Sequence, residues 1–190
     1  MARLTKQEII NKSITLFGQR GVDATSLQDI ADACVLRKAS LYSHFNGRDA
    51  IVTEAYKYAL GVYHDAMLDA TASYQDAPER INAMLDVIID LHDQDSDMFR
   101  FLVMNQYSQI AFPEVVNNQN VIQTLKDIID KGKASRDIKT DIDSNILALS
   151  IAGVLIQQSI GIMFKRLDRK MARYRNDIHS VCSSILGVNV

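Results

Sequence analysis

Polar side chains on one short predicted helix near the N-terminus have the types and spacing of a nucleic-acid contact. Two short apolar-periodic stretches flank a tight turn at residues 34–36, and the second buries Leu41 and Phe45 on one side of a helical wheel. This burial turns outward Lys38, Ala39, Tyr42 and Ser43, and it leaves Ser40 and His44 on the flanks. Such side chains can reach phosphate oxygens and base edges in a DNA groove. The pattern predicts a helix-turn-helix motif over about residues 26–45.

Arg48 places a cation just after this motif. It falls in the first turn of the next predicted helix, where a positive charge opposes the helix dipole. The placement is explained if Arg48 and the free amides of that turn bind a phosphate together. The alternative for the whole segment is a pair of surface helices with ordinary solvated side chains. Two capped short helices, the exposed arc, the closing aromatic residue and the following arginine together favour DNA binding.

The elements that must position these residues are all predicted to be helices. The chain of 190 residues has only 2 Pro and 8 Gly, and its apolar residues recur at helical spacing, which predicts an all-α protein of about nine helices. Thr5 and Glu8 have capping-box spacing at the first helix, and Thr25 and Gln28 have the same spacing at the second, where Ser26 can assist. Asn46 is the predicted N-cap of the fourth. The helices after the first cover residues 26–33, 37–44, 46 to about 70, 76–92, 98–110, 119–131, 144–165 and 169–186.

The DNA-binding segment of the TetR (tetracycline repressor) family resembles residues 26–51, SLQDIADACVLRKASLYSHFNGRDAI, and the likeness extends over residues 4 to about 63. The family usually has glycine where this chain has Val35, and often where it has Ala39. Because a β-branched residue resists positive φ, Val35 is expected to reshape the turn and tilt the reading helix. The resemblance implies backbone contacts by Ser26, Ser40, Tyr42, His44 and Arg48, and positions facing bases for Gln28, Lys38, Ala39 and Ser43.

The same resemblance implies that residues 1–48 form the DNA-binding domain and residues 49–190 an effector-binding and dimerisation domain. Dimerisation would use the last two helices in a four-helix bundle. Soft, aromatic and amide side chains could line an apolar pocket for a small-molecule effector, although plain core packing is the alternative for each of them. The candidate ligand contacts are Tyr63, Met67, Met104, Asn105, Tyr107 and Gln157.

Charge and composition narrow the classes of protein. The net charge of −2 divides into +2 over residues 1–50 and −4 over the rest, so DNA affinity is expected to depend on two copies binding together. No apolar run approaches the roughly 20 residues that span a bilayer, and the N-terminus is not a signal peptide, which favours a cytoplasmic protein. Cys34 and Cys182 are expected to be reduced core thiols. We find no catalytic constellation, and we expect no cofactor and no metal site.

The sequence therefore predicts a homodimeric, ligand-responsive repressor that binds a pseudo-palindromic double-stranded operator and is not an enzyme. A helical protein-interaction adaptor is the alternative. Neither hypothesis explains one cluster of charges. Six basic residues lie at the junction of the last two predicted helices, and Asp168 is the one acidic residue among them. A solvated face, a cross-subunit salt bridge or a second nucleic-acid surface would each explain it. The six are Lys165, Arg166, Arg169, Lys170, Arg173 and Arg175.

Overall fold

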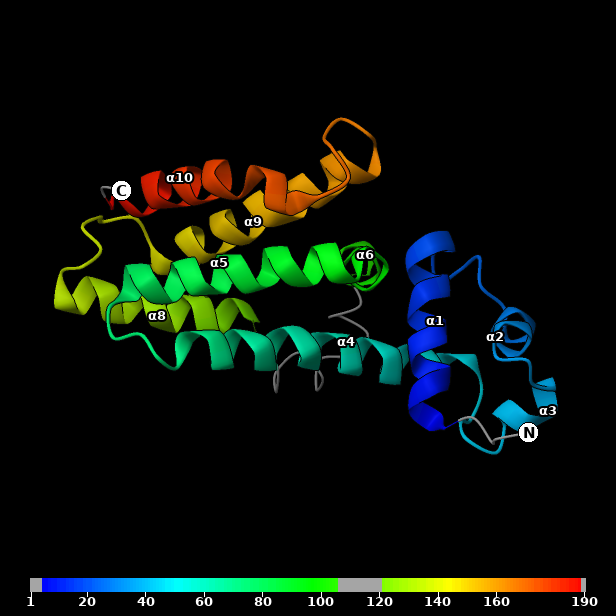
Figure 1. The fold of residues 1–190 in the computed structure, drawn as a ribbon. Helices are drawn as coiled ribbons and strands as arrows, with labels where there is room; N and C mark the ends of the chain where they lie inside the picture. The colour runs from blue at the N-terminus through cyan, green and yellow to red at the C-terminus, as the bar shows by residue number, and fades with distance from the viewer. Residues whose placement is uncertain (1–4, 106–120, 189–190) are drawn as a thin grey trace. The chain divides into compact units, whose positions relative to one another are not determined.

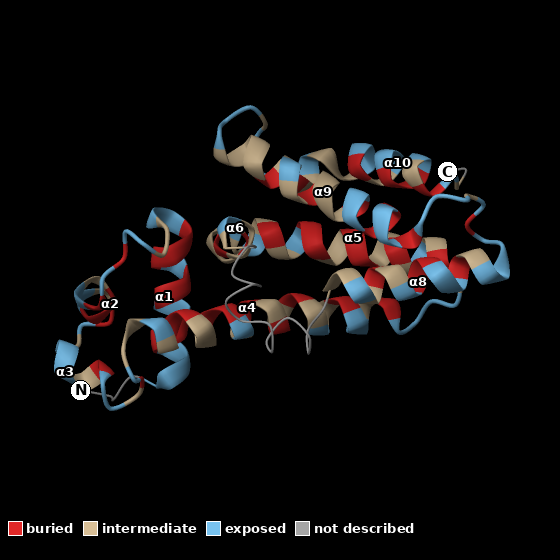
Figure 2. Cartoon of the chain, turned by 180° about the vertical axis from the view of Figure 1, so that it is seen from behind, coloured by how far each residue is buried: buried red, intermediate tan, exposed pale blue. Residues whose placement is uncertain are grey.

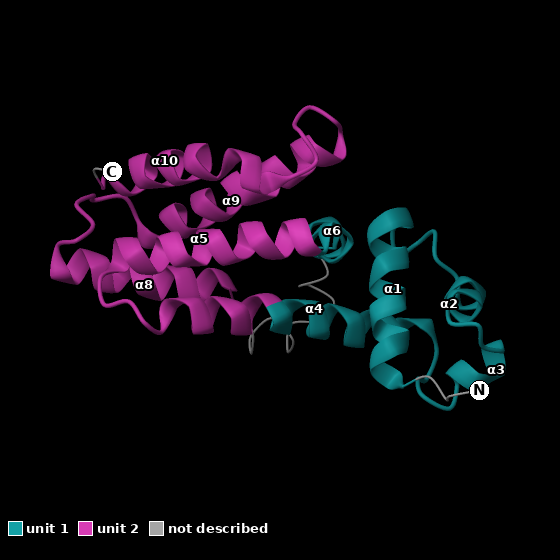
Figure 3. Ribbon diagram, in the orientation of Figure 1, with its two compact units in different colours: residues 1–62, 95–118 teal, residues 63–94, 119–190 magenta. Residues whose placement is uncertain are grey.

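The computed structural model of the chain describes residues 5–105 and 121–188. Over these ranges the regular structure consists of nine α-helices and one 3-10 helix, with no strand, so the predicted all-α class is confirmed (Figure 1). The chain divides into two compact units (Figure 3). The first unit comprises residues 1–62 and 95–118, and the second comprises residues 63–94 and 119–190.

The first unit is built from five helices around one apolar core. They are α1 (Lys6–Arg20), α2 (Leu27–Ala33), α3 (Lys38–Leu41), the first part of α4 (Arg48–Thr71) and α6 (Ser96–Met104). The buried side of each helix faces this core, as the red bands of Figure 2 show. Its fully buried residues include Ile9, Ile14, Phe17, Ile30, Leu41, Ile51 and Phe101.

The N-terminal caps fix where α1 and α2 begin. The predicted capping box of α1 is confirmed, because the Thr5 hydroxyl accepts from the Glu8 amide and the Glu8 carboxylate accepts from the Thr5 amide. At α2 the predicted pair of Thr25 and Gln28 is wrong. The box is made by Ser26 and Asp29 instead, while the buried Thr25 hydroxyl donates to a backbone carbonyl of the preceding loop.

Two predicted boundaries in the motif move by a few residues. The third helix was expected over residues 37–44, but α3 covers only Lys38–Leu41 and continues as a turn in which the amides of His44 and Phe45 donate to the Leu41 carbonyl. The fourth helix begins at Arg48, two residues beyond the predicted cap Asn46. Without a side-chain cap, a one-turn helix depends on its packing rather than on its own hydrogen bonds.

The helix α6 packs closely across α1 in the first unit. A Cβ atom on Gly18 would lie 2.1 Å from the carbonyl oxygen of Asp97, so only glycine permits this approach. Phe101 stacks on Phe17 with ring centroids 5.4 Å apart. The Gln19 amide group donates to the Asp97 carboxylate over 2.7 Å. The helix α6, whose Asp97 is 78 residues from Gln19, therefore belongs to the same unit as the predicted motif.

The second unit contains the end of α4 and four more α-helices. These are α5 (Ala77–Gln94), α8 (Val121–Ser135), α9 (Ser144–Met163) and α10 (Arg175–Leu186), with the 3-10 helix η2 (Met171–Tyr174) before α10. The chain reaches α10 through this 3-10 turn, so the helix predicted over 169–186 starts later than expected. Asp93 at the end of α5 accepts hydrogen bonds from the amides of Met171 and Ala172. Burial opposes its ionisation, but the Ala172 amide, the His92 ring and the Met171 amide keep the pKa of Asp93 below its ordinary value.

The helix α9 corrects one expectation about membranes. It has 20 residues, none of them charged, and its length and hydropathy would allow it to cross a bilayer, so the prediction that no apolar run approaches this length is wrong. Its Asn, Gln and Ser residues interrupt the apolar sequence, so a search for an unbroken apolar run does not detect this helix. Within the described structure 33% of its most apolar window is buried. A core helix that also packs against a partner subunit has the same composition.

Candidate nucleic-acid interface

The exposed arc of α3 has the orientation that the sequence predicts. Leu41 and Phe45 are buried at 1% and 5% exposure. Lys38, Ala39, Tyr42 and Ser43 are exposed, and Ser40 and His44 are half-buried. The arc is thus confirmed as a polar surface, and its contact with DNA stays a prediction.

Gln28 of α2 and the N-cap residue Ser26, both predicted DNA contacts, already have hydrogen-bond partners at the start of this helix. The Gln28 side chain is exposed and donates to Asp32 over 2.8 Å. The Ser26 hydroxyl accepts from the Asp29 amide and donates to the Asp29 carboxylate, and these contacts with Ser26 hold the pKa of Asp29 below its ordinary value. A base or phosphate that binds these residues must therefore exchange with an intrahelical partner.

The turn between α2 and α3 adopts the conformation that the sequence argues against. Val35 lies in the left-handed region with φ of 56°, and its side chain is 85% exposed. Its amide donates to the Asp32 carbonyl, and the Leu36 amide donates to the Ala31 carbonyl. This pair of bonds is the Schellman arrangement, which usually has glycine at the left-handed position. Val35 thus adopts the conformation expected of glycine instead of reshaping the turn.

Arg48 is anchored inside the first unit. Its Nε donates to the Thr25 carbonyl over 2.7 Å, and a terminal nitrogen donates to the Val22 carbonyl. The other terminal nitrogen lies 3.5 Å from the Asp49 carboxylate, and the side chain is 29% exposed. The guanidinium therefore ties the start of α4 to the loop before α2. Local sequence patterns carry no signal of these two bonds, because they join residues 23 and 26 positions apart.

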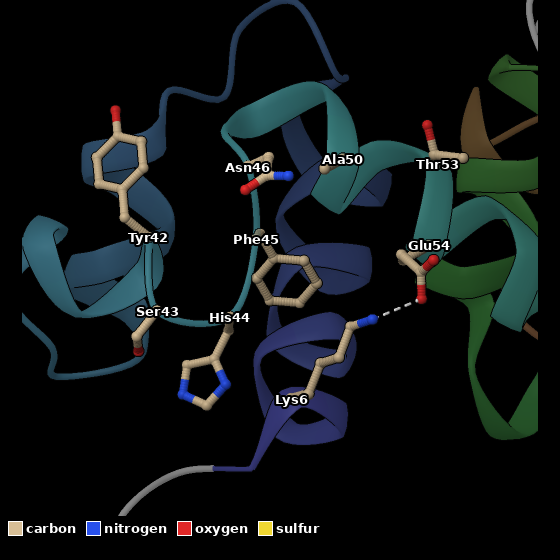
Figure 4. A pocket seen from close by; sticks show the side chains of 9 residues that line it. All are labelled: Lys6, Tyr42, Ser43, His44, Phe45, Asn46, Ala50, Thr53 and Glu54. Atoms are coloured by element: carbon tan, nitrogen blue, oxygen red, sulfur yellow. Dashed lines mark hydrogen bonds and ion pairs between the residues drawn. The ribbon is translucent and has the colours of Figure 1, made fainter.

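A groove beside the end of α3 contains residues that the sequence reasoning missed (Figure 4). It has a volume of about 410 Å³ and is lined by α1, the segment after α3, and the start of α4. The Lys6 ammonium lies 2.9 Å from the Glu54 carboxylate and 5.3 Å from the centre of the Phe45 ring. The groove is lined by Lys6, Tyr42, Ser43, His44, Phe45, Asn46, Ala50, Thr53 and Glu54. Three of the predicted DNA contacts, Tyr42, Ser43 and His44, therefore share one surface with a cation from α1.

The candidate effector contacts are distributed over both units. Tyr63 and Met67 are buried in the second unit, whereas Met104 and Asn105 belong to the first. Met104 is 51% exposed, and the Asn105 side chain donates to the Phe101 carbonyl. Gln157 is exposed on α9. Tyr107 lies outside the described residues.

The two thiols are buried, as the sequence predicts. Cys34 and Cys182 are each 1% exposed and free. Burial raises the pKa of the Cys34 thiol, and it raises the pKa of Cys182 to about 11. Both stay protonated at neutral pH. Among residues 5–105 and 121–188 no group of three His, Cys, Asp or Glu side chains could hold a metal ion.

A capped α2, a left-handed turn and a one-turn α3 with an exposed polar arc have the geometry of a helix-turn-helix motif. Residues 9–55 match the family model for bacterial regulatory proteins of the tetR family. Residues 9–55 therefore form a DNA-binding segment of the tetR-family type, and the chain is a DNA-binding transcriptional regulator.

Similar proteins cover nearly the whole chain. The negative transcriptional regulator IcaR of the biofilm operon icaADBC from Staphylococcus aureus is 23% identical, over 95% of this chain and 98% of that protein. Among solved structures, FadR from Bacillus subtilis in complex with stearoyl-CoA has a TM-score of 0.79 at 15% identity, covering 97% of this chain and 100% of that one. AibR in complex with isovaleryl coenzyme A and operator DNA also has a TM-score of 0.79, at 16% identity, covering 97% and 99%.

Proposed function

We propose that the chain is a homodimeric repressor that two reading helices hold on a pseudo-palindromic operator, and that a small molecule releases it. The observation that carries the DNA-binding part is the exposed arc of α3, whose opposite side is buried. The full-length similarity to a negative regulator supports repression. No catalytic step belongs to this function. The place of action is the cytoplasm, where a bacterial regulator meets its operator.

The proposed contacts divide into those that read bases and those that hold the backbone. Exposed residues of α2 and α3 approach base edges in the major groove, and the flanking polar residues bind phosphates. Arg48 can reach a phosphate only with the part of its guanidinium that the carbonyls of Thr25 and Val22 leave free. Base-facing residues are Gln28, Lys38, Ala39 and Ser43, and backbone-facing residues are Ser26, Ser40, Tyr42, His44 and Arg48.

Exposed apolar side chains on the last helices support the homodimer. Ile146 and Leu149 on α9 are 55% and 56% exposed, and Val181 on α10 is 48% exposed. Large apolar residues gathered on neighbouring helices mark an interaction surface. A second copy of α9 and α10 would cover them in a four-helix bundle, and this dimer would set the spacing of the two reading helices.

A coenzyme A thioester is the proposed class of effector. The structures of FadR and AibR that resemble this chain contain stearoyl-CoA and isovaleryl coenzyme A. Buried Tyr63 and Met67 in the second unit are proposed to contact the acyl chain, with Met104, Asn105, Tyr107 and Gln157 as further candidates. A ligand that binds the DNA-free arrangement more tightly lowers the population bound to the operator.

Operator affinity of point variants tests the DNA-binding part. The probe is the duplex that the wild-type protein selects from a random-sequence pool, and the measurement is fluorescence anisotropy. Lys38→Ala and Tyr42→Phe should each weaken binding about 5- to 100-fold, because one good polar contact is worth about 1–3 kcal/mol. The exposed Lys131→Ala on α8 is the control and should bind as wild type.

Wild-type affinity in both variants would contradict the proposal, and so would binding that does not weaken as salt rises, the behaviour expected of an adaptor. The same assay examines the effector. Stearoyl-CoA or isovaleryl-CoA should dissociate the complex, whereas free coenzyme A at equal concentration should not, because it lacks the acyl chain.

A further inference from the structure

The groove beside the end of α3 contains a half-exposed ion pair. Lys6 from the first turn of α1 lies 2.9 Å from the Glu54 carboxylate of α4, and the two side chains are 50% and 41% exposed. Figure 4 shows this pair on one side of the Phe45 ring, with Tyr42 and Ser43 on the other. The groove thus joins the ion pair to the exposed arc of α3 on one surface of the first unit.

Several hydrogen-bond donors of the groove can accept an external partner. Among the described residues, no hydrogen bond engages the side chains of Tyr42, His44 or Asn46. The Ser43 hydroxyl, in contrast, already donates to the Ser40 carbonyl over 2.7 Å. A phenol, an imidazole and a primary amide can each donate to a phosphate oxygen. The groove therefore offers an anion three donors beside its one ammonium group.

The position of Lys6 is unfavourable for a cation without an anionic partner. Lys6 is the first residue of α1, where the helix dipole repels positive charge. Glu54 compensates for this repulsion, and the Phe45 ring, 5.3 Å from the ammonium, attracts it as well. The centre of the His44 ring is 6.4 Å from that of Phe45. The cation is therefore held next to the predicted DNA contacts before DNA binds.

An exposed ion pair of this kind can exchange its carboxylate for another anion. Such pairs contribute little to stability, because both groups remain hydrated and lose side-chain freedom when they meet. An ammonium group that binds a DNA phosphate also releases a condensed counterion from the duplex. This release offsets the loss of the bond between Lys6 and Glu54.

We propose that the groove is a binding site for a backbone phosphate of the operator, and that Lys6 leaves Glu54 to bind this phosphate. The inference rests on the proposed function, because it requires α3 to lie in a major groove of DNA. That groove is about 12 Å wide and bordered by phosphates, so residues at the end of the reading helix lie next to the backbone. Glu54 then competes with DNA for Lys6 and lowers the affinity without reading a base.

The test measures operator affinity of the full chain with Lys6→Gln and Glu54→Gln, separately and combined, by anisotropy at several salt concentrations. Lys6→Gln should weaken binding at least about fivefold at 0.1 M salt and lower the slope of log K against log salt by about 0.9 for each bound protomer. Glu54→Gln should tighten binding about three- to tenfold, because Lys6 is then available to the phosphate. In the Lys6→Gln background the change at Glu54 should alter affinity by no more than about twofold.

The matched control is the ion pair of Lys126 and Asp130 on α8 in the second unit. Lys126→Gln and Asp130→Asn should leave both the affinity and the salt slope unchanged. If the pair in the groove only ties α1 to α4, Lys6→Gln and Glu54→Gln will both weaken binding and lower the thermal unfolding temperature, and the inference is wrong. An equal gain from Glu54→Gln with and without Lys6 would also overturn it, because Glu54 would then repel DNA directly.

These outcomes are distinguishable from a failure of the proposed function. Wild-type affinity in Lys38→Ala and Tyr42→Phe would refute the proposed function, and the phosphate site with it. If those two variants weaken binding while Lys6→Gln keeps the wild-type affinity and salt slope, the phosphate site alone is refuted.

Discussion

At the scale of single residues, the interface depends on side chains whose partners come from distant parts of the first unit. Arg48 illustrates this, because its guanidinium binds the carbonyls of Thr25 and Val22. A cation in the first turn of a helix opposes the dipole, and the sequence suggested a phosphate as compensation. Two backbone carbonyls already supply part of that compensation. Arg48 thus holds the recognition elements in place before DNA binds.

Val35 provides a prediction at this scale. A non-glycine residue in the left-handed region is disfavoured by roughly 1–2 kcal/mol, and the side chain of Val35 is exposed and buries almost nothing. Val35→Gly should therefore stabilise the protein by about 0.5–1 kcal/mol, because the gain is reduced by the entropy of glycine in the unfolded chain. Urea unfolding measures the change. Val35→Ala keeps the Cβ atom and should gain less; an equal gain in both variants would contradict the strain account.

At the scale of elements, the crossing of α1 and α6 decides what belongs to the DNA-binding unit. The helix α6 follows α5 in sequence, yet it is part of the first unit through Gly18, Asp97 and the stacked rings of Phe17 and Phe101. A helix pair this close has no room for a side chain at the crossing point. The integrity of the recognition elements therefore depends on a segment far outside the helix-turn-helix motif.

Gly18→Ala tests this dependence. Its Cβ would lie 2.1 Å from the Asp97 carbonyl oxygen, so α1 and α6 must separate, and we expect a loss of about 1–3 kcal/mol in stability. Thermal unfolding followed by circular dichroism gives the stability, and anisotropy gives the DNA affinity, which should fall with it. Thr15→Ala on the exposed side of α1 is the control. If Gly18→Ala unfolds at the wild-type temperature, the close crossing is not required.

At the scale of the whole molecule, the small excess charge of one reading head is an argument for the proposed dimer. Residues 1–50 carry seven basic and five acidic groups, and several of the basic groups are engaged internally. Two heads joined by α9 and α10 would bind as one unit, so the second contact would form at high effective concentration. Affinity is then governed as much by the dimer as by α3.

Leu149→Glu is the corresponding prediction. A charge in the centre of an apolar interface should leave the protein monomeric at micromolar concentration, because the buried carboxylate would have no partner. Sedimentation velocity measures the change, and operator affinity should fall by about a hundredfold as the avidity is lost. The control is Leu68→Glu, which changes an exposed leucine of α4 and should leave the protein dimeric. A dimeric Leu149→Glu would place the interface elsewhere.

The sequence alone determined the helical class, the buried and exposed sides of α3 and the capping box at Thr5, because these depend on spacing within a few residues. It could not determine the bonds of Arg48 or the pairing of Lys6 with Glu54, because those partners are brought together only by folding. The contact of α6 with Gly18 and the hydrogen bonds from the amides of Met171 and Ala172 to Asp93 were likewise decided by tertiary structure. Local patterns record which side of a helix is apolar. Which distant group satisfies a buried or charged atom is set by how the helices pack.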